Sequence, residues 1–142
     1  MQRSVVTPLV IIALGLLVAV GPSTIFAVCD HGVQLTNGRM MPMKCHWTAQ
    51  ASIAFGALIA LGGVLLLALQ AQAARMACGV MTAAVAAAEM LVPSVLIGVC
   101  GGETMPCHMV TAPALYFLCG VTVVLGLFTA LRAARTAGEA RA

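Results

Sequence analysis

A cysteine stands directly beside a histidine at two places in the chain, within MKCHWT at 43–48 and within MPCHM at 105–109. Thiolate, imidazole and thioether groups are ligands for soft or borderline metal ions, copper(I) above all and zinc next. Two histidines can also hold haem as axial ligands. The spacing matches no standard zinc or cytochrome c motif, because neither CxxC nor CxxCH occurs. The candidate metal ligands are Met43, Cys45, His46, Met105, Cys107 and His108.

Two further cysteines, Cys29 and Cys100, precede the two motifs. The environment outside a bacterial inner membrane is oxidising, so two cysteines within one short loop are more often bridged than free. Disulfides between Cys29 and Cys45 and between Cys100 and Cys107 would staple each loop to the end of its helix. This interpretation ranks first and metal or haem binding ranks second. Disulfide bonds and histidine ligation can also coexist.

A third interpretation is thiol redox catalysis. Four spans with a cysteine pair in each outer loop resemble the membrane disulfide-bond oxidoreductases that pass electrons to quinone. A histidine next to a cysteine can lower the pKa of the thiol and make its thiolate available. The first loop lacks a CxxC pair, however, and the cysteine spacing differs between the loops. A thiol-disulfide oxidoreductase coupled to quinone is therefore the alternative function.

Membrane-spanning helices must position these motifs. The chain has 142 residues, of which 62% are hydrophobic and 8% are charged, and its mean hydropathy is +1.08. A spanning helix needs about 20 mostly apolar residues, and four stretches reach that length. They are roughly Val5–Val28, Ala49–Leu69, Met76–Val99 and Ala112–Leu131. We therefore predict an all-α bundle of four transmembrane helices that forms a single membrane domain over residues 1–142.

The basic residues predict the orientation of this bundle. One side carries Arg3, Arg75, Arg132, Arg135 and Arg141, whereas the other side carries Arg39 and Lys44. Cytoplasmic loops are enriched in Lys and Arg, so we expect both termini in the cytoplasm. Loops 28–48 and 100–112 would then face outward from a bacterial inner membrane. The chain has no clustered basic patch with interleaved aromatics, which argues against nucleic acid as a partner.

The sequence indicates a duplicated hairpin. PSTIFAVC at 22–29 and PSVLIGVC at 93–100 share the pattern Pro-Ser-x4-Val-Cys, and each precedes a Met-x-Cys-His motif. We predict one repeat over 1–75 and a second over 76–142. They would be parallel repeats, related by an axis along the membrane normal, which brings both Cys-His pairs to one outer rim.

Prolines and small residues predict the shape of each hairpin. Pro22 and Pro93 each remove a backbone donor near the outer end of a helix, so both helices should kink there. The hydroxyl groups of Ser23 and Ser94 are available to satisfy the freed carbonyl groups. Small residues allow close approach between helices, and they include Gly56, Gly120 and Gly126.

Glu89 is an acidic residue inside a predicted span, roughly 15 Å from the outer end of its helix at 1.5 Å per residue. A charged side chain at that depth costs a few kcal/mol, so Glu89 should face the bundle interior and be neutral or partnered. Thr122 or Cys119 lies at a similar depth on the fourth helix. Glu89 is either a proton relay or a contact for a partner's cation, or else a protonated, hydrogen-bonded structural residue.

The stretch MKCHWTAQA at 43–51, with the upstream Cys29 and the second MPCH motif, resembles an uncharacterised bacterial family of small four-helix integral membrane proteins. That family carries a Met-x-Cys-His-Trp-Thr motif, and the resemblance covers essentially the whole chain. The second half matches less well, because Met109 stands where the tryptophan would be. Genes of the family often lie near ABC transporter genes, so the resemblance implies an accessory role. It implies no established activity and no assigned ligands.

Together these observations predict an integral inner-membrane accessory protein without enzymatic activity. Its disulfide-stapled outer loops would present a cluster of cysteine, histidine and methionine residues able to bind copper or haem. No phosphate-binding glycine loop, serine nucleophile motif or HExxH motif occurs in the chain. The expected partners are the lipid bilayer and an ABC transporter permease.

Overall fold

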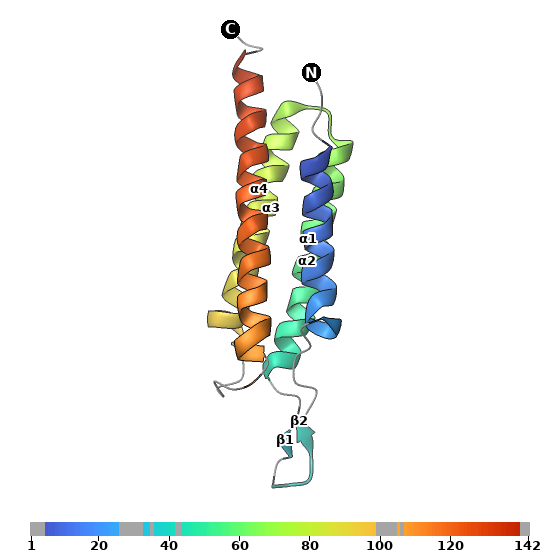
Figure 1. Ribbon diagram of the computed structural model, residues 1–142, viewed down its shortest axis with the longest axis vertical. Coiled ribbons are helices and arrows are strands. Elements are labelled where there is room, and N and C mark those ends of the chain that lie inside the picture. The colour runs from blue at the N-terminus through green and yellow to red at the C-terminus, as the bar shows by residue number, and fades with distance from the viewer. Residues whose placement is uncertain are drawn as a thin grey trace.

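The computed structural model describes residues 5–25, 33–34, 36–41, 44–98, 105 and 107–139 (Figure 1). Within these residues the long helices are α1 (Val6–Thr24), α2 (Lys44–Ala68), α3 (Gln72–Leu91) and α4 (Ala112–Glu139). A π-helix, η1 (Val92–Leu96), extends α3, and a second π-helix, η2 (Cys107–Thr111), leads into α4.

Four segments of the described chain are long and apolar enough to cross a membrane. In hydrocarbon every backbone N–H and C=O group needs a partner within the protein, and a helix supplies these partners within one segment. Large apolar side chains cover the outside of the bundle, where Leu61 is 53% exposed and Phe117 is 71% exposed. Such a surface fits lipid rather than water. The prediction of an all-α, multi-pass membrane protein with four helices is therefore confirmed.

The helices pack as two hairpins placed side by side. α1 lies mainly against α2 and α3 lies mainly against α4, while α2 with α3 and α1 with α4 make smaller contacts. α1 begins and α4 ends at one end of the bundle, and α2 and η2 begin at the opposite end (Figure 1). The core between the helices consists of Ile11, Val18, Ile59, Leu66, Ala86, Leu115 and Cys119. The predicted repeat symmetry and the predicted cytoplasmic termini stay predictions.

Glycines allow the backbones within each hairpin to touch. A Cβ atom added to Gly56 would lie 2.7 Å from the Gly15 carbonyl oxygen, and one added to Gly126 would lie 2.9 Å from the Gly79 carbonyl oxygen. Both distances leave no room for a side chain, so these glycines set the spacing of their helices. The prediction for Gly120 was wrong, because the nearest described atom to a Cβ there is 3.8 Å away.

The helices extend further than the apolar stretches that predicted them. α2 begins at Lys44 rather than Ala49, so the CHWT motif lies in its first turns and not in a loop. α3 begins at Gln72 rather than Met76, and α4 runs to Glu139 rather than Leu131. Hydropathy places a boundary where the apolar run ends. The residues added to α3 and α4 are mainly Gln, Ala and Arg, which are good helix formers, so the backbone stays helical beyond that boundary. Helix propensity does not explain the first turn of α2, which is mostly Cys, His, Trp and Thr.

This extension corrects both loop predictions at their C-terminal ends. Loop 28–48 ends before Lys44, and loop 100–112 ends before Cys107, where η2 begins. Within the first loop, β1 (Val33–Gln34) and β2 (Met40–Met41) pair antiparallel, which the sequence did not predict. Strands of two residues are too short to show an alternating pattern of apolar and polar side chains.

The two prolines that were predicted to kink helices have different effects. Pro22 is buried within α1, which stays α-helical, and Ser23 Oγ donates to the carbonyl three residues earlier at 2.8 Å. Pro93 lies in η1, where a wider π-turn replaces the α-helix. Ser94 Oγ donates to the carbonyl four residues earlier at 3.2 Å. Both serines bond carbonyl groups of the preceding turn, but not those that the prolines free, which belong to Val18 and Glu89. Only the third helix changes its helix type at its proline.

Candidate functional site

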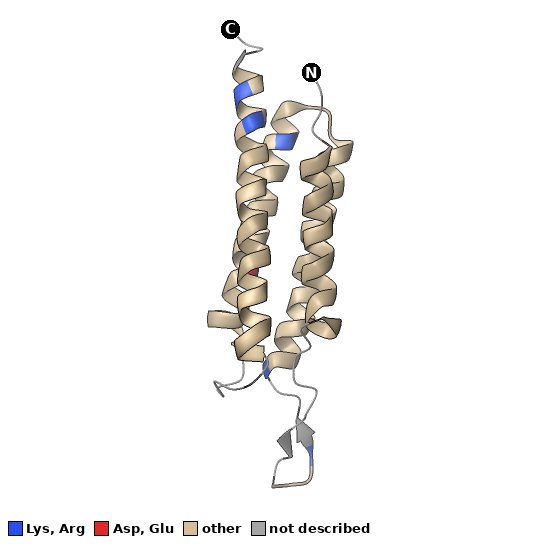
Figure 2. Cartoon of the chain, viewed as in Figure 1, with Lys and Arg blue, Asp and Glu red and all other residues tan. Residues whose placement is uncertain are grey.

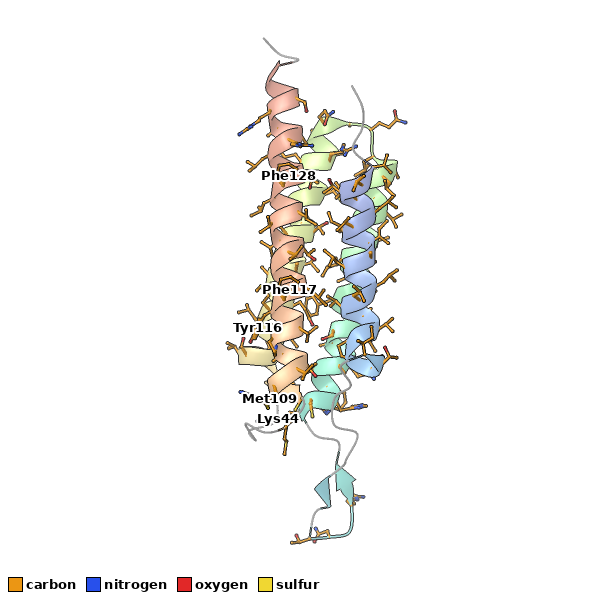
Figure 3. The ribbon with its side chains drawn as sticks, in the orientation of Figure 1. Lys44, Met109, Tyr116, Phe117 and Phe128 are labelled. Atoms are coloured by element: carbon orange, nitrogen blue, oxygen red, sulfur yellow. The ribbon has the colours of Figure 1, made fainter. Side chains whose placement is uncertain are left out.

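The two Cys-His pairs lie at the same end of the bundle. The first pair is in the first turn of α2, and the second pair opens η2. Figure 3 shows Lys44 and Met109, which neighbour the two pairs in sequence, at this end of the molecule. We call it the motif end. The structure thus places at one end of the bundle two motifs that lie far apart in the sequence.

Within each pair the sulfur is buried and the imidazole is exposed. Cys45 and Cys107 are both 0% exposed, whereas the side chains of His46 and His108 lie on the surface. Successive residues of the α-helix α2 point about 100° apart, and those of the wider π-turn of η2 also point in different directions, so neighbours do not both face the interior. The cysteines can therefore act only within the bundle, and the histidines can meet ligands outside it.

Apolar side chains accompany the exposed histidines at the motif end. Trp47 is 57% exposed and Met109 is 65% exposed. The ring centres of His46 and Trp47 lie 5.9 Å apart in an edge-to-face arrangement with an interplanar angle of 82°. Tryptophan is enriched at membrane interfaces because its ring is apolar and its N–H is polar. This position fits the boundary between the bilayer and water.

The predicted metal ligands do not form one cluster among the described residues. No three His, Cys, Asp or Glu side chains in that part of the chain lie close enough together to hold a metal ion. The Met105 carbonyl oxygen accepts a hydrogen bond from the His108 backbone N–H at 3.0 Å. Met43, Cys29 and Cys100 lie outside the described residues. The metal site and the two disulfides therefore stay predictions.

About one helical turn beyond each cysteine lies a buried threonine. Thr48 in α2 and Thr111 in η2 are each 1% exposed. Thr48 Oγ1 donates to the Gly98 carbonyl oxygen at 2.9 Å, which connects α2 to the segment that follows η1. Sequence reasoning missed this contact. The available signal was the threonine that closes the CHWT motif on the same helix face as Cys45.

Glu89 on α3 meets Ser52 on α2 in the bundle interior. A hydrogen bond of 2.5 Å joins Ser52 Oγ and Glu89 Oε1, and both side chains are 0% exposed. Glu89 Oε2 has no hydrogen-bond partner among the described residues. An acid in contact with lipid is costly, which accounts for its interior position.

The surroundings of Glu89 differ in part from the sequence-based expectation. Cys119 on α4 is buried and lies within electrostatic range of Glu89. Thr122 Oγ1 instead donates at 2.8 Å to a carbonyl one turn earlier in its own helix. Sequence reasoning also missed Ser52, whose Oγ lies 3.0 Å from the Thr48 carbonyl oxygen. A hydroxyl in an apolar helix, one turn beyond a buried threonine, was the available signal.

Basic residues lie near both ends of the bundle (Figure 2). Arg75 near the start of α3, and Arg132 and Arg135 towards the end of α4, lie away from the motif end. The Arg132 guanidinium carbon is 4.3 Å from the centre of the Phe128 ring, which is a cation–π contact. Which end faces the cytoplasm stays a prediction from the positive-inside rule.

The comparison with known proteins identifies one family. Residues 11–131 match the family described as a domain of unknown function, DUF4418. No curated protein and no solved structure matches the chain. The matched range includes most of every spanning helix, both Cys-His pairs, Ser52 and Glu89. The chain is therefore a member of the DUF4418 family.

Proposed function

We propose that the protein is a non-enzymatic accessory component of the bacterial inner membrane. In this proposal the motif end faces outward, is stapled by two disulfides and offers its histidines to copper or haem. The observation that carries the proposal is the opposite burial of the two members of each Cys-His pair. Cys45 and Cys107 are 0% exposed, while His46 and His108 are on the surface.

Burial of the Cys45 and Cys107 sulfur atoms favours structural disulfides over a catalytic role for these cysteines. A redox-active thiolate must reach the sulfur of a substrate disulfide, and reactive cysteines are accordingly found in partly exposed positions. Cys45 and Cys107 lack that access. Disulfides from Cys45 to Cys29 and from Cys107 to Cys100 would instead restrain the loops that precede α2 and η2. The alternative, a thiol-disulfide oxidoreductase coupled to quinone, needs these thiols to become exposed during turnover.

The exposed histidines are the groups best placed to hold copper or haem. Two imidazoles at one end of the bundle fit either an axial pair on haem or two ligands of a copper ion. The buried sulfurs do not fit the same site, because each points away from the neighbouring imidazole. His46 and His108 would therefore hold the group, and Met43 and Met105 would supply soft thioether ligands from the adjoining sequence.

A transporter partner is supported by the resemblance noted from the sequence and by the surface of the motif end. The accessory role that the resemblance implies needs a surface that another membrane protein can contact. Trp47 and Met109 are exposed apolar side chains at the motif end. Aromatic residues and methionine are enriched in protein interfaces, so these two positions are the proposed contact with an ABC transporter permease.

The decisive experiment is an absorption spectrum and a metal analysis of the purified protein, with thiol alkylation before and after reduction. We expect a Soret band or stoichiometric copper that is lost when His46→Ala and His108→Ala are combined. His31→Ala is the control, because it removes a histidine outside both motifs. A colourless, metal-free protein with four protected cysteines would contradict the metal site but keep the staples. A mixed disulfide trapped by Cys45→Ala or Cys107→Ala would support the oxidoreductase instead.

A further inference from the structure

The hydrogen bond between Ser52 and Glu89 lies well inside the membrane-spanning part of the bundle. Ser52 stands eight residues after Lys44, the first residue of α2, which is about 12 Å along the helix. Both side chains are completely buried, and one carboxyl oxygen of Glu89 has no partner among the described residues. This site lies deeper than the motif end and has no part in the function proposed above.

No described cation faces the Glu89 carboxyl group. α1 contains no titratable residue. In α4, Cys119 lies near Glu89, Tyr116 lines a pocket on the outer surface, and Arg132, Arg135 and Glu139 lie thirteen or more residues beyond Cys119 along the helix. On α3 itself, Arg75 and Cys78 lie more than ten residues before Glu89. The titratable residues of α2 are confined to its first turn: Lys44, Cys45 and His46. η1 has none, and those of η2 are Cys107 and His108. A buried carboxylate without a cation would cost several kcal/mol, whereas a neutral acid needs only hydrogen bonds.

The hydrogen atoms at the site also favour a neutral acid. The Ser52 hydroxyl has one hydrogen but two acceptors, Glu89 Oε1 at 2.5 Å and the Thr48 carbonyl oxygen at 3.0 Å. If Glu89 carries a proton, it donates to Ser52 Oγ, and Ser52 donates its own hydrogen to the Thr48 carbonyl. Each hydrogen then serves one acceptor. If Glu89 is ionised, the Ser52 hydroxyl can serve only one of the two, and the Thr48 carbonyl keeps only its backbone hydrogen bond within α2.

The same face of α2 holds α3 on both sides of its π-turn. Ser52 binds Glu89 before η1, and Thr48 donates to the Gly98 carbonyl after it. The two hydroxyls are one helical turn apart on α2, so they act as a clamp across η1. π-turns within α-helices are frequent at functional sites. These two hydrogen bonds hold the end of the third span against α2.

We propose that Ser52 and Glu89 form a proton-binding site inside the membrane. The Glu89 carboxyl group carries its proton while the clamp is closed and exchanges it when the clamp opens. The ligand is a proton, and the described contacts do not form a continuous proton wire, because the chain of hydrogen bonds ends on backbone carbonyls.

Reaction with two carbodiimides tests whether Glu89 is protonated while the clamp is closed. The experiment uses the full-length protein in membranes at neutral pH. Dicyclohexylcarbodiimide enters lipid and reacts with protonated carboxyl groups, whereas a water-soluble carbodiimide reaches only aqueous carboxyls. We expect one adduct per chain on the peptide that contains Glu89 with the first reagent and none with the second. Thr48→Val removes one of the two hydrogen bonds of the clamp and should therefore accelerate labelling of Glu89 roughly fivefold. That factor corresponds to a loss of about 1 kcal/mol in the free energy that keeps the clamp closed. Thr122→Val, which removes a hydroxyl bonded only within its own helix, should not change the rate.

Infrared spectroscopy gives a second measurement that does not depend on a folded variant. A protonated carboxyl group has a C=O stretching band that an ionised group lacks, and this band should be present in the unmodified protein at neutral pH. Glu89→Gln should remove the band and keep the fold, because a neutral amide replaces a neutral acid of the same shape. A spectrum without the band, together with no adduct on Glu89, would overturn the proposal. Equal labelling rates of Glu89 in Thr48→Val and in the parent protein would overturn the proposal that Glu89 exchanges its proton when the clamp opens.

Discussion

Thr48 donates a hydrogen bond of 2.9 Å to the carbonyl oxygen of Gly98, although fifty residues separate them in the sequence. Thr48 closes the CHWT motif, and Gly98 follows the π-turn that ends the third span. Gly98 has a φ of +80°, which a residue with a side chain adopts only at a cost. The CHWT motif at the start of α2 therefore holds the end of the third span in place, where the chain leaves η1.

Thr48→Val should lower the stability of the protein in detergent or nanodiscs. Valine keeps the shape of threonine but leaves the Gly98 carbonyl without the hydroxyl, and buried hydrogen bonds in membrane proteins contribute about 0.5 to 1.5 kcal/mol. Thermal unfolding of the two proteins measures the difference. Thr122→Val is the matched control, because Thr122 is equally buried and its hydroxyl bonds only to its own helix. Equal losses in the two variants would show that the interhelical bond contributes nothing.

The number of helices could be predicted from the sequence, because a spanning helix needs a long apolar run and little else. Each of the four stretches forms a helix over most of its described residues, and Glu89 lies inside the bundle. The predicted ends of the helices were less accurate than their predicted number. Lys44 and His46 are polar residues in the first turn of α2, and hydropathy cannot separate a polar helix end from a loop.

The division within the Cys-His pairs could not be predicted from sequence. Which member of a pair is buried depends on the helix face that points into the bundle, and both pairs were predicted in loops rather than in helices that begin at Lys44 and Cys107. The partner of Glu89 was missed for another reason. Ser52 lies on a different helix, and the register between α2 and α3 is set by packing contacts rather than by a pattern in either helix. Hydroxyl residues are common in spanning helices, so Ser52 alone did not point to Glu89.

Gly56→Ala should strongly destabilise the first hairpin. An added Cβ would lie 2.5 Å from the Ala19 backbone nitrogen and 2.7 Å from the Gly15 carbonyl oxygen. Backbone atoms cannot move aside as a flexible side chain can, so α1 and α2 would have to separate, at a cost of about 1 to 3 kcal/mol. Gly120→Ala is the control, because its nearest neighbour is the end of the Met90 side chain at 3.8 Å.

The control should stay within about 1 kcal/mol of the parent, and any change should favour the variant because alanine has the higher helix propensity. Thermal unfolding of both variants gives the comparison. A Gly56→Ala variant as stable as Gly120→Ala would contradict the close crossing of α1 and α2.

Cysteine labelling in intact cells should show the motif end outside. His46→Cys and Met109→Cys place thiols at exposed positions of that end, and Arg135→Cys places one at an exposed position near the other end. A membrane-impermeant maleimide should label the first two variants in intact cells and the third only after permeabilisation. The parent protein gives the background from its native cysteines. Labelling of Arg135→Cys alone in intact cells would reverse the orientation.

A double-mutant cycle should reveal strong coupling between Ser52 and Glu89. Ser52→Ala leaves a buried carboxyl group without its described partner, which should cost about 1 to 3 kcal/mol. Glu89→Met removes the carboxyl group and leaves Ser52 its bond to the Thr48 carbonyl, so this change should cost less. The double variant should then resemble Glu89→Met alone. The coupling energy, from thermal unfolding of all four proteins, should therefore be about 1 kcal/mol or more.

The matched control is the same cycle with Thr122→Val in place of Glu89→Met. Ser52 has no hydrogen bond to Thr122, whose hydroxyl bonds within α4, so the two changes should add to within about 0.5 kcal/mol. Coupling confined to the cycle with Glu89 would mean that the acid is held by one specific hydroxyl. Additive losses in both cycles would instead mean that the interior tolerates the carboxyl group without Ser52, because another group satisfies it.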